Sequence, residues 1–372
     1  MTAQAVIERE APEAPTEEMP APAPKRRLIT PTRAAAIAGL AALVALPIPF
    51  GDFGFFIGQY ALVYAILGLS IVVVTGYAGL ISLMPYTFAG IGAATTGAAM
   101  SSWGWPFWLA ACLGALATAP VAVLVGITSV RLKGLYLAIA TLTFANALGE
   151  TLFKWDRAMG GGTGWLVERP SIGPVDLSSD ASFYALLLVV VAVLVWMVEG
   201  LRTSRMGRAM LAVRDNEMEA QALGINPYKT KLAAFVLGGI LAGFGGSFLA
   251  LLLLNVTREA FQSPQVEATS LLLITLVAIG GINRAIGAFF GAVALVAQQQ
   301  VFAGAESLFA IFGIYASLLL ILFLMFRPGG IVQAGKILVD LTRARPAIGV
   351  AIFATILIVN VGGAYLIVRF LS

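Results

Sequence analysis

The sequence carries few side chains of the kinds that catalyse reactions or hold metals. Histidine is absent from all 372 residues, and the one cysteine, Cys112, lies in an apolar run. This composition excludes histidine-based triads, imidazole general bases, the usual zinc sites and a disulfide within the chain. Residues 330–336 read G-x-x-x-x-G-K, but Ile337 stands where a phosphate-binding loop needs Ser or Thr for magnesium. We therefore expect no metal, no bound cofactor and no enzymatic activity in this chain.

The arginine-rich segment 202–231 is the most informative polar stretch. Within it, Asp215 or Asn216 can cap the N-terminus of a helix that ends at Gly224. Two glutamates fall in its first turn, where acidic side chains complement the helix dipole. A helix of two turns is about 10 Å long, too short to cross a membrane, so it must lie at the membrane surface.

This short helix is expected to bind another protein. A helix of so few turns has little stability unless something packs on it, and the membrane spans are not expected to reach it easily. It displays Met218, Ala222 and Leu223 beside Glu217 and Glu219. The alternative is a solvated basic loop that only sets the topology of the chain in the membrane.

Most of the chain has the composition of a membrane protein. Hydrophobic residues make up 59% of it and charged residues 11%, with a mean hydropathy of +0.93. Continuous apolar runs of about 20 residues, the length that spans a bilayer as a helix, recur throughout. We predict an all-α integral membrane protein with eleven spans at 34–50, 55–75, 82–102, 106–130, 134–153, 182–201, 230–254, 268–283, 285–305, 309–326 and 347–368.

The positive charges give these spans a direction. With the N-terminus in the cytoplasm, only five of the 23 basic residues lie outside, namely Lys154, Arg157, Arg169, Arg258 and Arg369. This asymmetry follows the positive-inside rule and predicts a multi-pass membrane protein with a cytoplasmic N-terminus, rather than a binding site for nucleic acid. The chain divides into four parts: a disordered cytoplasmic tail at 1–33, a transmembrane domain at 34–331, a cytoplasmic linker at 332–346 and an additional C-terminal transmembrane helix at 347–372.

Glycine, proline and polar residues mark the segments 76–92 and 255–267, where re-entrant or broken helices are the alternative to the regular arrangement of spans. Polar or aromatic side chains in and near them are candidates to line a translocation path, namely Ser82, Tyr86, Thr87, Phe88, Asn146 and Ser270. No span has an ionisable residue near its middle, where an ion-coupled carrier usually keeps one. This favours an external energy source over an ion gradient.

Several short motifs, taken in their order and spacing, resemble the permease subunit of branched-chain amino acid ABC importers, specifically the longer of the two related permeases. The resemblance runs from about Gly51 to Ile331. Its motifs are G-Y-A-G-L-I-S-L at 76–83, L-K-G-L-Y-L-A-I-A-T-L at 132–142, G-G-x-x-G at 160–164, S-R-M-G-R-A at 204–209, R-D-N-E-M-E-A-Q-A-L-G-I-N at 214–226 and F-R-P-G-G-I at 326–331. Ten of the eleven predicted spans fit this family, and the C-terminal one is extra.

The resemblance implies that 216–224 is the coupling helix, which docks into a groove on a cytoplasmic ATPase. Against the E-A-A-x-x-x-G pattern of importer permeases, either Glu217 or Glu219 supplies the acid. The residues implied to take part in coupling are Arg214, Asn216, Glu217, Met218, Glu219, Ala220, Leu223 and Gly224. The sequence departs from its relatives at Met84 and Pro85, where Gly and His are common, and at Ala288, where Pro is usual; these departures bear on the substrate.

The resemblance also implies partners: a second, related permease, two ATPase subunits that hold ATP and magnesium, and an external amino-acid-binding protein. The implied function is ATP-driven import of branched-chain or other small amino acids. The alternatives are a urea or short-amide permease of the same class, an ion-coupled secondary carrier and a membrane scaffold that transports nothing.

Overall fold

The computed structural model describes residues 51–292 and 296, apart from 133, 162, 173, 174, 263, 264 and 290. The N-terminal tail and the C-terminal linker predicted from the sequence lie outside these residues. So do the spans predicted at 34–50, 309–326 and 347–368, and most of the one predicted at 285–305.

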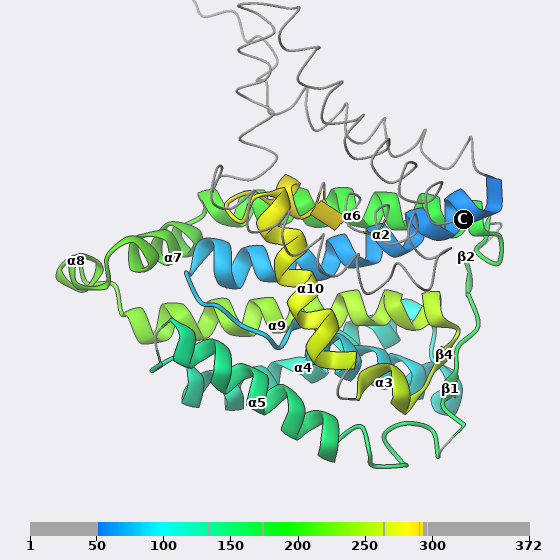
Figure 1. The fold of residues 1–372 in the computed structure, drawn as a ribbon. Helices are drawn as coiled ribbons and strands as arrows, with labels where there is room; N and C mark the ends of the chain where they lie inside the picture. Colours follow the sequence, from blue (N-terminus) through cyan, green and yellow to red (C-terminus); the bar gives the residue numbers. More distant parts are fainter. Residues whose placement is uncertain are drawn as a thin grey trace, which may run out of the picture.

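Four long helices of the described part run along a common direction (Figure 1). They are α2 (Gly51–Ile71) with its π-helical continuation η2 (Val72–Tyr77), α4 (Phe107–Ser129), α6 (Asp180–Thr203) and α9 (Pro227–Leu253). Each is long and apolar enough to cross a membrane, with α2 and η2 together giving the span Gly54–Tyr77. These helices match four of the predicted spans, so a multi-pass helical membrane protein is confirmed.

Three further predicted spans form helices that are shorter or less apolar. They are α3 (Pro85–Trp103), α5 (Leu135–Thr151) and α10 (Gln265–Gly280). Helix α3 is rich in Gly, Ala, Ser and Thr, and α10 crosses the other helices obliquely (Figure 1). The count of eleven spans stays a prediction.

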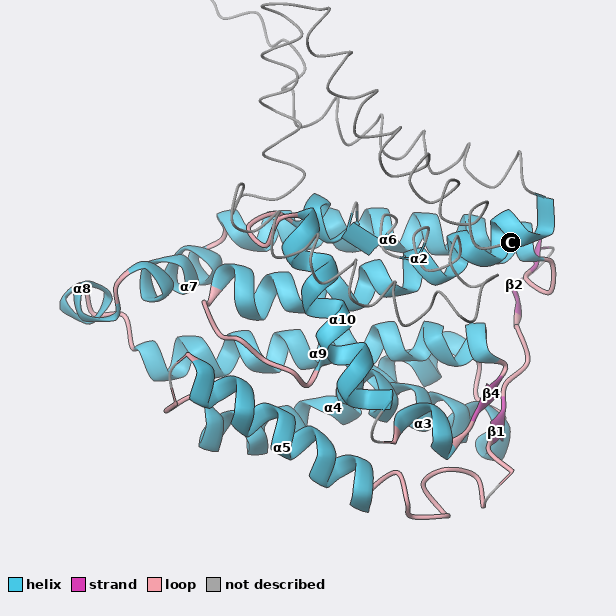
Figure 2. Ribbon diagram, viewed as in Figure 1, coloured by secondary structure: helices cyan, strands magenta, loops and turns pink. Residues whose placement is uncertain are grey.

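The two ends of this helical layer differ (Figure 2). At one end, the strand end, β1 (Trp165–Leu166) pairs antiparallel with β4 (Asn255–Val256), and β2 (Ser171–Ile172) pairs with β3 (Val175–Asp176). At the other, the α8 end, lie the polar helices α7 (Arg205–Asp215) and α8 (Glu217–Ala222). The two ends therefore offer different surfaces to anything that binds from either side.

Helix α9 lies at the centre of the packing and contacts α2, α3 and α4. Close approach depends on small residues, as in many membrane helix pairs. A methyl group on Gly92 of α3 would overlap the backbone of Gly243, and one on Gly246 of α9 would overlap the backbone of Ala89. The glycine-rich face of α9 is thus a packing surface between α3 and α9.

Two breaks interrupt the regular helices, in the segments that the sequence marked as irregular. After Tyr77 the chain is non-helical until α3 begins at Pro85, and Leu83 N donates to Thr141 Oγ1 of α5 at 3.1 Å. After α9, the chain passes through β4 and the 3-10 helix η3 (Arg258–Phe261) before α10. A hydrogen bond connects the two regions: the hydroxyl of Tyr86, in the first turn of α3 after the first break, donates to the carbonyl of Ala260 in η3 at 3.2 Å.

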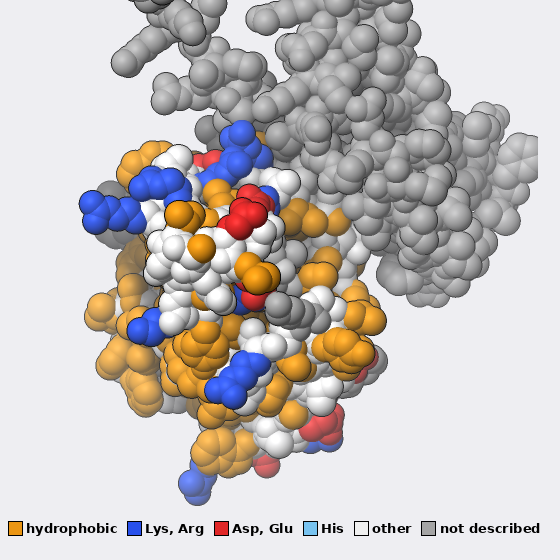
Figure 3. All heavy atoms as spheres, turned by 90° about the vertical axis from the view of Figure 1, so that its left-hand side faces the viewer, with side chains coloured by type: hydrophobic (Ala, Val, Ile, Leu, Met, Phe, Trp, Pro, Cys, Tyr) orange, Lys and Arg blue, Asp and Glu red, His pale blue; other side chains and the backbone are white. Residues whose placement is uncertain are grey.

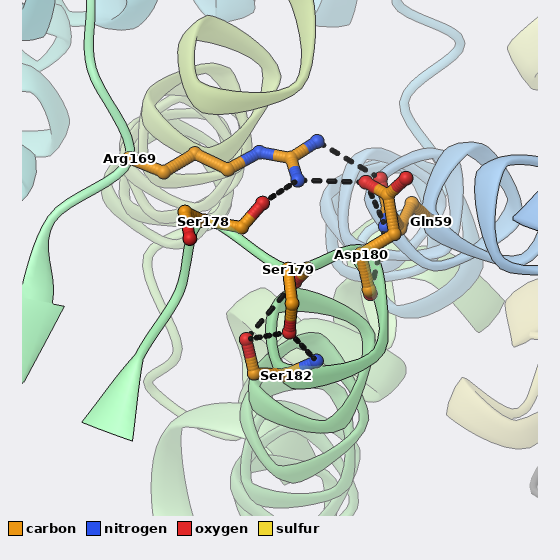
Figure 4. Close-up of polar contacts among 6 residues, drawn as sticks. All are labelled: Gln59, Arg169, Ser178, Ser179, Asp180 and Ser182. Atoms are coloured by element: carbon orange, nitrogen blue, oxygen red, sulfur yellow. Dashed lines mark hydrogen bonds and ion pairs between the residues drawn. The ribbon is translucent and has the colours of Figure 1, made fainter. Parts of the chain in front are cut away.

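At the strand end, Arg169 fastens the long connection between α5 and α6 onto two helices (Figure 4). Its Nη1 donates to Asp180 Oδ1 at 2.7 Å, and its Nη2 to Gln59 Oε1 at 3.4 Å. Gln59 Nε2 donates in turn to the Asp180 carbonyl at 2.9 Å. Arg169 Cζ also lies 4.6 Å from the centroid of the Phe183 ring. These contacts hold the ends of α2 and α6 together.

Candidate coupling surface and polar path

Helix α8 is formed by local capping. Asn216 ends α7 and begins α8: its Oδ1 accepts from Met218 N at 3.0 Å and from Glu219 N at 3.4 Å. The Glu219 carboxylate accepts in return from Asn216 Nδ2 at 2.7 Å. Asn216 thus satisfies two backbone N–H groups at the start of α8, and Glu219 holds the Asn216 side chain in place. Beyond the helix, Gly224 has a φ of +80°, a conformation that glycine adopts at little cost. The predicted short helix is confirmed, with Asn216 as its cap.

One face of α8 packs against the rest of the chain. Ala220 is buried, and Glu217 forms an ion pair with Lys231, whose side chain is almost fully enclosed near the start of α9. The sequence reasoning expected the spans not to reach this helix easily. The structure corrects this, because Lys231 fastens α8 to α9. Part of the packing that stabilises α8 therefore comes from its own chain.

The open face of α8 and its C-cap residue Leu223 carry apolar side chains beside the exposed Glu219. Met218 is 81% exposed and Leu223 78% exposed. Figure 3, which faces the α8 end, shows basic side chains scattered over this surface, few acidic ones and broad areas of apolar side chains. Met218 and Leu223 are therefore free of contacts that would keep them from packing into a groove on another protein.

A hollow of about 510 Å³ lies beside α8, between it, the end of α4 and the start of α9. It is lined by Val130, Arg131, Glu217, Gln221, Gly224, Ile225, Asn226, Pro227, Tyr228 and Lys231. Arg131 Cζ lies 5.9 Å from the centroid of the Tyr228 ring, and this contact holds the two side chains together in one wall of the hollow. The Glu217–Lys231 pair therefore forms part of this hollow as well as the anchor of α8.

Arg214, in the last turn of α7, contacts the interior of the same chain. Its Nη1 donates to the carbonyl of Gly76 in η2 and to Asn283 Oδ1, the latter at 2.8 Å. The side chain lies so close to Gly79 that a Cβ there would overlap Arg214 Cγ. Arg214 also forms an ion pair with Asp215 at 3.2 Å. It thus joins α7 to the start of the 78–84 break and to the turn after α10.

The candidate path residues fall into two groups in the structure. Tyr86 stacks near the Phe261 ring, with centroids 5.4 Å apart, and Phe88 contacts the Phe235 ring of α9 edge-on. Ser82 is buried in the first break. These residues belong to the packed interior around the breaks.

The second group places polar atoms of three helices in a buried setting. Thr87 of α3 and Ser270 of α10 are fully buried, and their hydroxyl oxygens have no hydrogen-bond partner among the residues that the structure describes. Asn146 of α5 donates through Nδ2 to Glu267 Oε1 of α10 at 2.7 Å. Helix α10 contacts both α3 and α5. Whether substrate passes these side chains stays a prediction.

A profile of the family described as "Branched-chain amino acid transport system / permease component" matches residues 55–327. The chain belongs to this family. It is accordingly a transmembrane permease subunit of an ABC importer. The predicted family resemblance is confirmed.

The permease is similar to curated proteins of known role. The high-affinity branched-chain amino acid transport system permease protein LivM of Salmonella typhimurium is 29% identical over 307 residues, covering 74% of this chain and 69% of the relative. LivM of Escherichia coli is 27% identical over 305 residues, with the same coverage. The nucleoside ABC transporter permease protein NupC of Lactococcus lactis is 29% identical over 161 residues, covering 38% of this chain and 48% of the relative. No solved structure matches the permease.

The sequence reasoning missed one acidic residue of the permease. It placed a span at 268–283, which left Glu267 in a preceding loop. In the structure α10 begins at Gln265, so Glu267 lies in its first turn and reaches Asn146. The spacing of Glu267 and Ser270 could have indicated this. They are three residues apart, so a helix that begins before residue 267 places both on one face.

The anchor of α8 gives a first testable prediction. Replacing Glu217 by Ala leaves the enclosed Lys231 unpaired, and we expect this to lower the stability of the permease by roughly 1–3 kcal/mol. This is less than for a fully buried pair, because Glu217 is 30% exposed in its side chain. Thermal unfolding of the detergent-solubilised complex measures the effect.

Two further variants decide whether the ion pair is the cause. The exchange Glu217→Lys with Lys231→Glu should recover most of the loss. Glu219→Ala, which removes only the capping contact, should cost about 1 kcal/mol or less. An exchanged pair as unstable as Glu217→Ala alone would argue that Glu217 stabilises α8 in another way.

Proposed function

We propose that this permease imports branched-chain or other small amino acids, using ATP that separate subunits hydrolyse. The observation that carries the substrate class is the similarity to the two LivM proteins along 74% of this chain. The nucleoside permease covers only 38% of it. A nucleoside is therefore the second candidate substrate, and urea or a short amide remains an alternative within the same class.

The proposed assembly contains a second, related permease that completes the translocation path. Two cytoplasmic ATPase subunits, which bind ATP and magnesium, dock at the α8 end, and an external binding protein delivers substrate at the strand end. The charge distribution supports this orientation: Arg202, Arg205 and Arg208 lie at the α8 end, as do Lys229 and Lys231. Cytoplasmic segments of membrane proteins are enriched in such residues.

The open face of α8 supports its proposed role as the coupling helix. Met218 and Leu223 project away from the chain, whereas Ala220 and Glu217 attach the helix to α7 and α9. A groove on the ATPase that covers the two exposed side chains would move α8 when the ATPases close. Because Arg214 lies three residues before the first residue of α8, this motion would reach Gly76 and the turn at Asn283 directly.

The motion would next reach the break at 78–84, which runs from Gly79 beside Arg214 to the start of α3. The Leu83 amide of this break donates a hydrogen bond to α5. The hydroxyl of Tyr86, in the first turn of α3, donates a hydrogen bond to a carbonyl of η3. A displacement of this break would therefore shift α3 and α5 relative to each other. Such a rigid-body shift of helices is a common way to open a path alternately to the two sides.

The function is tested by purifying the permease gently from its native membrane and reconstituting the material that comes with it. We expect ATPase and second-permease subunits to co-purify, and proteoliposomes to accumulate labelled leucine only when ATP and the binding protein are supplied. Accumulation of adenosine in place of leucine would favour the nucleoside alternative. Transport by the permease alone under an ion gradient would contradict the proposal and support a secondary carrier.

A further inference from the structure

A carboxylate lies where the first turn of α10 meets α5, close to the strand end of the described helices. Glu267 of α10 is bonded to Asn146, which sits five residues before the end of α5, or about 8 Å along the helix. Glu267 is half-buried, and α10 packs against α2, α3 and α5. An ionisable group at such a depth raises the free energy of the protein, and in membrane proteins it commonly marks a substrate or ion pathway.

Polar atoms without a partner gather on the helices around Glu267. Asn146 Oδ1, Thr87 Oγ1 and Ser270 Oγ are buried and have no hydrogen bond within the described residues. Ser270 lies on the same face of α10 as Glu267, and Asn146 Oδ1 belongs to the amide that already binds Glu267. Each buried polar atom left unpaired costs roughly 1–3 kcal/mol. A polar ligand would remove part of this cost.

The available atoms favour one kind of ligand group. The Glu267 carboxylate carries negative charge and accepts several hydrogen bonds at once, and Asn146 Oδ1 is an acceptor beside it. An ammonium group offers three donors and a positive charge, so it matches both. A phosphate or a carboxylate would be repelled by Glu267, and a neutral nucleoside or urea would gain nothing from its charge.

We propose that Glu267, oriented by Asn146, binds the α-ammonium group of an amino acid during its passage through the permease. This inference rests on the proposed function, amino-acid import. Glu267 is then a residue that selects the substrate by its charge. The Ser270 hydroxyl lies on the same face of α10, and the Thr87 hydroxyl lies on α3, which α10 contacts. This ammonium site does not distinguish amino acids by their side chains.

The test replaces Glu267 by Gln, which keeps the shape and the hydrogen bond to Asn146 but removes the charge. In proteoliposomes of the complete importer, we expect the half-saturation concentration for leucine to rise, or its maximal uptake to fall, by about 10- to 100-fold. Uptake of the 2-hydroxy analogue of leucine, which lacks the ammonium group, should change little. The preference for leucine over this analogue should therefore shrink.

The matched control is Glu150→Gln, because Glu150 is an exposed carboxylate of α5 paired with Lys154. Its leucine uptake should equal that of the wild type. Asn146→Ala provides a second variant if Glu267→Gln assembles poorly; it should reduce the preference for leucine in the same direction and to a smaller extent.

Three outcomes would overturn the inference while leaving amino-acid import intact. They are wild-type leucine uptake by Glu267→Gln, an equal loss for leucine and its 2-hydroxy analogue, and an unchanged preference in Asn146→Ala. Equal loss would mean that Glu267 only stabilises the start of α10, where an acid complements the helix dipole. Failure of the proposed function is distinguishable, because the wild-type importer would then not take up leucine at all.

Discussion

Replacing Met218 and Leu223 together by Asp should abolish substrate-stimulated ATP hydrolysis by the assembled importer. Both side chains are about four-fifths exposed on the open face of α8. Burying each in a groove of the ATPase would contribute roughly 1.5–3 kcal/mol, and a carboxylate in that groove would be unfavourable. The affinity between permease and ATPase should fall by about 100-fold or more.

The folded permease should tolerate this double substitution, because neither side chain packs in its interior. Membrane insertion and thermal unfolding of the permease should therefore match those of the wild type, and only the amount of co-purified ATPase should fall. Met206→Asp, a methionine of α7 that is 38% exposed, serves as the matched control and should retain the ATPase. Full stimulation of ATP hydrolysis in the double variant would rule out α8 as the coupling helix.

Replacing Arg214 by Ala should separate ATP hydrolysis from transport while the complex still assembles. The substitution removes the hydrogen bonds to Gly76 and Asn283, the links between α7 and the segments next to the first break. Hydrogen bonds from a charged donor are worth roughly 1.5–3 kcal/mol each. We expect leucine uptake to fall by about 10- to 100-fold and the ATP consumed per leucine transported to rise accordingly.

The control for Arg214 is Arg208→Ala on the same helix. Arg208 is exposed and donates to the carbonyl of Thr203, just before α7 begins, so its loss removes an equal charge but neither link. Arg214→Lys should recover only part of the transport, because one ammonium cannot reproduce the planar fork of the guanidinium. Asn283→Ala tests the second link alone. Normal ATP use per leucine in both Arg214→Ala and Asn283→Ala would exclude this route of coupling.

The proposed coupling route and the proposed ammonium site use different parts of the same helices. Arg214 acts at the α8 end, on the start of the 78–84 break, whereas Glu267 binds Asn146 near the strand end of α5. The break lies between them and contacts α5 through Leu83 and Thr141. A change at Arg214 should therefore alter the efficiency of coupling, and a change at Glu267 the choice of substrate.

Local features of the sequence were sufficient to predict the individual elements. Long apolar runs predicted α2, α4, α6 and α9, because a helix that crosses lipid must be apolar over its own length. The cap at Asn216 and the stop at Gly224 predicted α8, because capping involves residues only a few positions apart. Glycine and polar residues likewise marked the segments in which the helices break.

The partners of the polar side chains were decided by the tertiary structure. Arg214 bonds to a carbonyl 138 positions away and to an amide 69 positions away, and Asn146 bonds to Glu267 across 121 positions. No periodicity or short motif encodes such pairs, since they depend on how whole helices pack. Composition and local residue patterns thus determined that this chain crosses a membrane with helices and carries the short helix α8. Only helix packing decided that Glu217 anchors that helix, that Arg214 connects it to the interior, and that Glu267 lies among buried polar groups.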